Sequence, residues 1–74
     1  MVPLSHLAPG KEAVIVEIRG GMGWRRRLME LGLMEGMRIK VIQRLFPGPV
    51  VIAVGNARVV LGFGMAQRIM VREV

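Results

Sequence analysis

The side chains that could act as nucleophiles, acids or metal ligands are few in this 74-residue chain. It contains no Cys, Asp, Thr or Tyr, and its one Ser and one His are the neighbours Ser5 and His6. A Ser-His-acid triad needs three side chains that converge from separate positions, and no Asp is present to serve as the third. Without Cys, neither a disulfide nor a thiolate metal site can form. We therefore expect no catalytic residues, no enzyme activity, no cofactor and no metal site.

Arginine supplies most of the remaining chemistry. Eleven Lys and Arg stand against five Glu, which gives a formal net charge of +6. Such a surplus indicates a nucleic acid, an anionic membrane surface or an acidic protein face as partner. Arg25, Arg26 and Arg27 follow a glycine-rich stretch at 20–23, a combination that can bind anions. A nucleotide-binding P-loop also needs Gly-Lys-Ser/Thr, which the chain lacks, so a solvated arginine face is the simpler interpretation.

The elements that must position these residues are short and mostly β-branched. Glycine and proline separate them at close intervals, a pattern typical of a small all-β barrel, and we expect one domain over residues 1–74. In the last strand, simple alternation predicts that Ile69 and Val71 face inward and Met70 outward. The expected strands cover residues 13–18, 37–44, 50–54, 57–61 and 69–74.

The first strand has apolar residues on both faces, so alternation alone does not select its buried face. The segment Leu-Ala-Pro-Gly at 7–10 precedes this strand as Leu-Met-Glu-Gly at 33–36 precedes the next strand, 26 residues later. This repeat favours Ala13 and Ile15 as core residues, whereas simple alternation favours the positions between them. A β-bulge at 16–17 would reconcile the two, because one extra residue switches the face of a strand.

One segment departs from the β pattern. Trp24, Leu28 and Leu31 are spaced at i, i+4 and i+7, which predicts a short helix with these three residues on its buried face. Gly32 is placed to end the helix. We expect this helix to pack over one end of the barrel.

Two loop tips carry large apolar residues that the strand pattern does not require. These are Leu-Phe-Pro-Gly-Pro at 45–49 and Gly-Phe-Gly-Met at 62–65. Apolar residues at stiffened tips often mark a contact surface. Together with the arginine-rich helix they give a predicted partner-binding set of Arg25, Arg26, Met29, Leu45, Phe46, Pro47 and Phe63.

The sequence resembles the FeoA family, the small cytoplasmic accessory proteins of ferrous iron transport in bacteria and archaea. The resemblance spans almost the whole chain, through residues 7–10, 27–36, 59–61 and 65–71. Its most specific part is Arg-Leu-x-x-x-Gly-Leu-x-x-Gly at 27–36. The departures are Glu35, where Pro is common and whose presence would loosen the turn, and Gly62, where Arg is common. The structural motif implied by the resemblance comprises Leu28, Leu31, Gly32, Leu33, Gly36 and Ala66.

The resemblance implies a mainly β, SH3-like five-stranded barrel with one short helix after the first strand. It also implies a non-catalytic, cytoplasmic accessory role, with the cytoplasmic part of a FeoB-type membrane GTPase-permease as partner. The alternative is a small basic barrel that binds RNA or DNA, but its basic strand faces lack the aromatic platforms of single-strand binders. No segment is suited to membrane insertion, and pairing of two copies through a sheet edge stays open.

Overall fold

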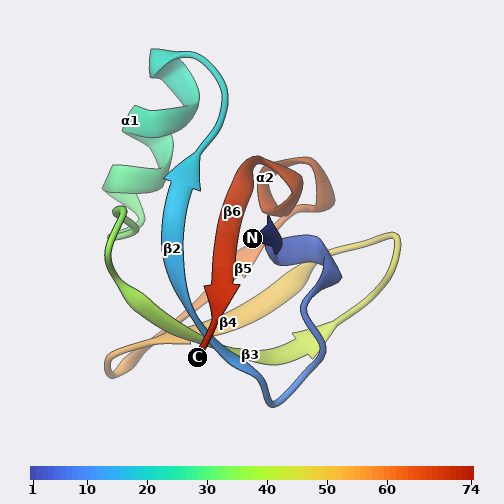
Figure 1. Cartoon of the computed structure of the whole chain (residues 1–74). Helices are drawn as coiled ribbons and strands as arrows, with labels where there is room; N and C mark the ends of the chain where they lie inside the picture. The colour runs from blue at the N-terminus through green and yellow to red at the C-terminus, as the bar shows by residue number, and fades with distance from the viewer.

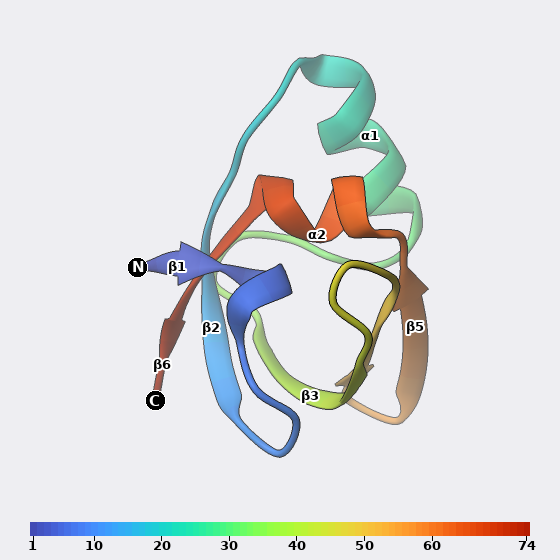
Figure 2. The same cartoon turned by 90° about the vertical axis from the view of Figure 1, so that its right-hand side faces the viewer.

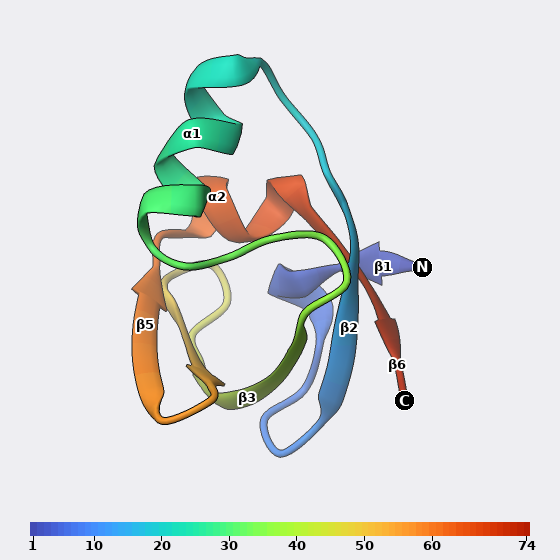
Figure 3. The same cartoon turned by 90° about the vertical axis from the view of Figure 1, so that its left-hand side faces the viewer.

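The computed structural model describes residues 1–74, and its six strands form one antiparallel sheet in the order β1-β6-β2-β3-β4-β5. The sheet curls around a central core, α1 stands above it, and α2 lies across one opening (Figures 1, 2 and 3). The strands are β1 (Val2–Pro3), β2 (Glu12–Ile18), β3 (Arg38–Arg44), β4 (Val50–Val54), β5 (Ala57–Leu61) and β6 (Ile69–Glu73). The helices are the 3-10 turn η1 (Leu4–His6), α1 (Met22–Glu30) and α2 (Phe63–Arg68).

Two elements go beyond the sequence-based expectation of five strands and one helix. The short strand β1 adds a sixth strand because Val2 pairs with Val71 of β6. The second helix, α2, begins at Phe63, inside the segment expected to be a loop tip. Gly62 and Gly64 suggested a turn there, yet Ala66 is fully buried and anchors one helical face in the core.

Strand β2 switches face at a bulge, as the sequence repeat predicts. Ala13, Ile15 and Ile18 are buried at 0%, 1% and 5% exposure, so both the early and the late part of the strand contribute to the core. The pairing register between β2 and β6 shifts between Ile15 and Glu17. A bulge bends its strand and increases the local twist, which helps the sheet to curl. The predicted core positions Ala13 and Ile15 are therefore confirmed.

The end of α1 explains why one predicted core residue is exposed. The N–H of Gly32 donates to the carbonyl of Met29, and that of Leu33 to Leu28, at 2.9 Å each. With Gly32 at φ +85°, this is a Schellman motif, which reverses the chain after a helix. The reversal buries Leu33 and Leu28 fully and leaves Leu31 at 42% exposure. The prediction that Leu31 lies on the buried face is wrong, since Leu33 takes that place.

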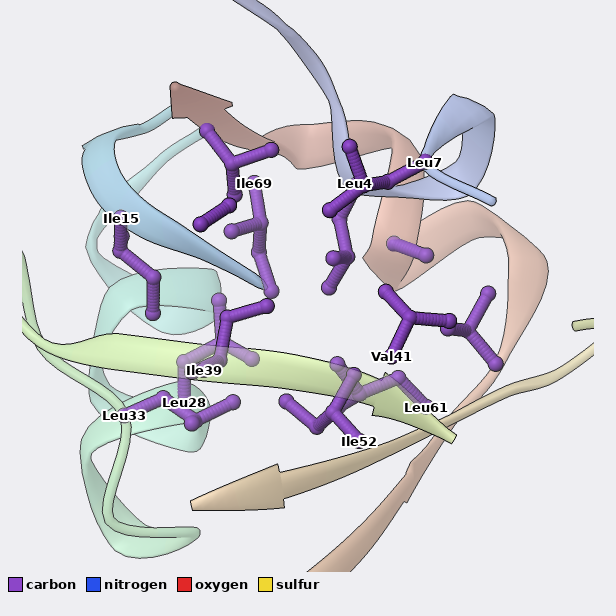
Figure 4. Packing of buried hydrophobic residues seen from close by; sticks show 14 of the residues in the cluster. Leu4, Leu7, Ile15, Leu28, Leu33, Ile39, Val41, Ile52, Leu61 and Ile69 are labelled. Atoms are coloured by element: carbon purple, nitrogen blue, oxygen red, sulfur yellow. The ribbon is translucent and has the colours of Figure 1, made fainter. Parts of the chain in front are cut away.

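The core is aliphatic and contains residues from every strand except β1. Figure 4 shows Ile15, Val41, Ile52 and Ile69 converging on it from four strands. Met70 is a second exception to the expected pattern, because it is buried at 7% exposure although it lies outside the main core cluster. It pairs with Pro3 on one side and Glu17 on the other, so neighbouring strands flank it on both sides.

No helix of the structure has the length and apolar character needed to cross a bilayer.

Candidate partner-binding surface

Helix α1 presents an exposed face on which methionine and arginine alternate. Met22 is 80% exposed and Met29 60% exposed, and they lie two helical turns apart. Together with Arg25, Arg26 and Glu30 they line a shallow hollow of about 420 Å³. Methionine side chains are flexible and polarisable, so an exposed group of them adapts to varied partners. Of the residues in α1, only Leu28 is fully buried, which leaves this face available for contact.

Arg25 has a structural task on the inner side of this face. Its Nη1 donates to the carbonyl of Ile18 at 3.0 Å, and its Nη2 lies 3.4 Å from Oε1 of Glu35. The other carboxylate oxygen of Glu35 accepts the N–H of Ile18 at 3.2 Å. Arg25 and Glu35 thus satisfy both backbone groups at the end of β2. Glu35 ties the turn to the sheet instead of loosening it, which corrects the expectation from the resemblance.

The second group of predicted residues gathers around the β3–β4 loop. Phe46 is 58% exposed, and its ring meets Phe63 edge-on at 5.4 Å between centroids and His6 at 5.6 Å. The guanidinium of Arg44 lies 5.9 Å from the centroid of Phe46. Leu45 beside it is 55% exposed. The aromatic contacts fasten the loop to η1 and to the start of α2 while its tip stays accessible.

The predicted partner-binding set therefore divides into two surfaces. Figure 1 shows α1 and the β3–β4 loop on opposite sides of the molecule. The first surface, the α1 face, contains Arg25, Arg26 and Met29 of the predicted set. The second, the loop tip, contains Leu45, Phe46, Pro47 and Phe63. Sequence reasoning missed Met22, His6 and Arg44, whose places depend on contacts between distant segments or on helix exposure.

Trp24 connects α1 to α2 through a cation–π contact. The guanidinium of Arg68 lies 4.7 Å from the centroid of the Trp24 ring. Beside them, an open hollow of about 630 Å³ separates the two helices and is lined by Arg27 and Met65, among others. A Cβ on Gly20, whose φ is +117°, would lie 3.0 Å from Trp24, so the indole packs tightly against that glycine. This arrangement fixes the position of the first turn of α1.

The charge of the chain is unevenly compensated. Four ion pairs use four of the five Glu: Lys11–Glu73, Arg19–Glu17, Arg25–Glu35 and Arg38–Glu12. The remaining acid is Glu30, whereas the positive side chains outside these pairs are Arg26, Arg27, Lys40, Arg44, Arg58, Arg68 and Arg72. No group of three or more His, Cys, Asp or Glu lies close enough to hold a metal ion. The surface therefore favours anionic partners.

Comparison with known proteins places this architecture in a defined class. The FeoA domain model matches residues 2–73. A Methanocaldococcus jannaschii protein, whose name proposes a role as Fe(2+) transport protein A, is 34% identical over 99% of this chain and 88% of its own length. The chain belongs to the FeoA domain family, which serves as an accessory in ferrous iron transport, and the family predicted from the sequence is confirmed.

Solved structures agree with this assignment. The crystal structure of an iron uptake regulatory protein, FeoA, superimposes with a TM-score of 0.93 at 41% identity, covering 99% of this chain and 97% of the other. A manganese-dependent transcriptional repressor matches with a TM-score of 0.89 at 26% identity, but the match covers 97% of this chain and only 41% of the repressor. The mainly β, SH3-like fold class is thereby confirmed, with six strands in place of five.

Proposed function

We propose that this protein is a non-catalytic, cytoplasmic accessory module of ferrous iron uptake that docks on the cytoplasmic part of a FeoB-type GTPase-permease. The family match over residues 2–73 supports the iron-transport setting. The residue inventory supports the non-catalytic role, because Ser5 is fully buried and its neighbour His6 is exposed, an arrangement unsuited to a nucleophile and its base. Any nucleotide hydrolysis would then belong to the partner.

The α1 face is the observation that carries the docking proposal. Met22 and Met29 expose apolar surface on a helix that buries little against its own domain. Arg26 lies between them and has no ion-pair partner. An adaptable apolar strip with an unpaired positive charge suits an acidic protein face with apolar centres. We assign the main contact to these three residues, with Arg25 holding the helix in position.

The loop tip is a proposed second contact. Leu45 and Phe46 are more than half exposed, and Pro47 between strands β3 and β4 is exposed as well. Phe63 supports Phe46 from α2. Because this tip and α1 lie on opposite sides, a partner that reaches both must wrap around the module (Figure 1).

Binding of the full chain to the purified cytoplasmic domain of its cognate permease tests the proposal by calorimetry. We expect Arg26→Glu and Met29→Glu each to weaken binding by about tenfold or more, since each removes a central contact. Arg72→Glu is the matched control, because Arg72 is exposed at the far end of β6 and lies in no ion pair. Absence of binding at tens of micromolar, or equal losses in Arg72→Glu and Arg26→Glu, would count against the α1 face.

The nucleic-acid alternative has less support because several of its arginines are engaged within the fold. Arg38 lies 3.1 Å from Glu12, and Arg68 stacks on Trp24. Phe46, the exposed ring nearest to a free arginine, already contacts two other rings. A fluorescence titration with single-stranded RNA and DNA at low salt checks this alternative, and we expect no saturable binding.

A further inference from the structure

The outer edge of β5 is unpaired along its whole length. β5 is the last strand of the sheet, and none of the hydrogen bonds that join different elements involves residues 57–61. Figures 2 and 3 show β5 at the margin of the molecule, with no segment beyond it. Natural edge strands are usually shortened, covered or protected by several charges, since free backbone groups pair readily with another chain. On β5 the only charged residue is Arg58.

The hairpin geometry identifies which backbone groups face this edge. A two-residue turn joins β4 to β5, and Val54 and Ala57 form its closing pair. In such a hairpin the closing residues exchange hydrogen bonds, and bonded and non-bonded pairs then alternate along the strands. The N–H and C=O groups of Arg58 and Val60 therefore point away from β4, toward the free edge.

The side chains of the same two residues give this edge its chemical character. Arg58 and Val60 share the outer face of β5, and Val60 is 66% exposed. Arg58 takes part in no ion pair. Beside Val60 a surface hollow of about 430 Å³ is lined by Leu31 and Met65, with Arg27 at its rim. An apolar site thus lies between two arginines, Arg58 on the strand and Arg27 on α1.

We propose that the β5 edge binds an extended segment of a partner protein by strand addition, and that this segment alternates apolar with acidic residues. Its backbone bonds to the free groups of Arg58 and Val60. One of its apolar side chains enters the hollow beside Leu31 and Met65, and a carboxylate pairs with Arg58. This surface is separate from the α1 face, so the proposal does not depend on docking to a permease.

Charge selects an acidic segment over a second copy of this chain. Each copy carries a net charge of +6 and no acidic residue on β5, so pairing two β5 edges would bring two positive surfaces together. An acidic segment gains attraction from the same charges, and its binding weakens with salt. Strand addition uses backbone bonds for affinity and side-chain pockets for specificity, which matches the two kinds of group present here.

The probe is the peptide acetyl-Val-Glu-Val-Ile-Val-Glu-amide, titrated into the full 15N-labelled chain. Its two Glu and the Ile lie on one face of a strand, opposite the three Val. We expect amide shifts centred on Arg58 and Val60 and extending to Leu31 and Met65. The same peptide with Lys in place of Glu should bind at least about tenfold more weakly. Shifts confined to α1, or none at millimolar peptide, would overturn the proposal.

Two variants separate backbone pairing from side-chain contact. Val60→Pro removes one outward N–H and leaves the β4–β5 ladder intact, so it should cost about tenfold in peptide affinity. Val60→Thr keeps that N–H and should lose clearly less. Should Val60→Pro fail to fold by circular dichroism, Arg58→Glu replaces it and should make the Lys peptide the better ligand. Equal affinities in all variants, or a β5-dependent dimer by light scattering, would refute strand addition by an acidic segment.

Discussion

The N–H of Gly36 donates to the carbonyl of Ile15 at 2.7 Å. An equivalent bond of 2.7 Å joins Gly10 to Val41, and both of its partners are displaced by 26 residues from those of the first. The N–H groups of the two acceptor residues bond in return to the residues that follow the glycines, at 2.9 Å each. Strands β2 and β3 therefore hold each other through two equivalent turns, related by an approximate two-fold axis.

The equivalence continues beyond the turns. Register shifts lie between Ile15 and Glu17 in β2 and between Val41 and Gln43 in β3, again 26 residues apart. Both strands thus bend one step after their glycine contact. The repeat seen in the sequence corresponds to a repeated device that curls the sheet twice.

The first prediction concerns the glycine turns. Gly36 has φ +93°, and a Cβ there would meet nothing within 4 Å, so Gly36→Ala costs only backbone strain, about 1–2 kcal/mol. Gly23→Ala is the control, because Gly23 lies within α1, where alanine is the better helix former. Urea unfolding should show a loss for the first variant and no loss for the second. A variant at Gly36 as stable as the control would contradict this account of the turn.

A second prediction separates the two leucines of α1 and its end. Leu28 is fully buried and Leu31 is 42% exposed. Leu28→Ala should therefore lower the free energy of unfolding by about 2–5 kcal/mol. Leu31→Ala should change it by less than about 0.5 kcal/mol. Thermal unfolding followed by circular dichroism measures both, and similar losses at the two positions would mean that the Schellman turn does not select Leu33.

The third prediction tests the Glu35 contact with β2. Glu35→Ala removes the acceptor for the N–H of Ile18 and the partner of Arg25, and should cost about 1 kcal/mol. Glu35→Gln keeps an acceptor oxygen and should cost less. Glu30→Ala, at the acid without an ion pair, serves as the control and should be neutral. If Glu35 loosened the turn, its replacement by alanine would stabilise the protein instead.

The cation–π contact between α1 and α2 gives a fourth prediction. Arg68→Gln removes the guanidinium 4.7 Å from Trp24 and should cost about 0.5–1 kcal/mol. The emission of Trp24, the only tryptophan, should change at the same time. Arg72→Gln is matched in chemistry and touches no aromatic ring. Identical emission and stability in the two variants would show that the contact contributes nothing in solution.

Local patterns in the sequence were sufficient to predict much of the fold. The hairpin of β4 and β5 has the predicted bounds, because Gly55-Asn56 interrupts two β-branched runs. Gly55 has φ +58° and Asn56 has no positive φ, which is the pattern of a type II′ turn. The buried face of β2 followed from comparing two turns rather than from alternation. In each case the information lay within a few residues.

Features formed by distant segments could not be predicted in this way. Strand β1 exists because Val2 meets Val71, and no local pattern in a two-residue strand announces that pairing. The same holds for the site, where His6, Phe46 and Phe63 come together from three parts of the chain. The role of Arg25 depends on a backbone carbonyl in another element. Residue type indicated that these side chains were available for contact, and tertiary structure decided which contacts they make.

The sparse anchoring of α1 has a consequence for how the molecule opens. The helix is held by buried Leu28, by Trp24 under Arg68 and by the bonds of Arg25, and it follows the conformationally free pair Gly20-Gly21. Releasing it breaks these few contacts and leaves the strand ladder intact. Its amide hydrogens should therefore exchange with solvent well before those of β2 and β3, and limited proteolysis should begin there. The module behaves as a rigid barrel with one hinged flap, and the flap bears the exposed methionines.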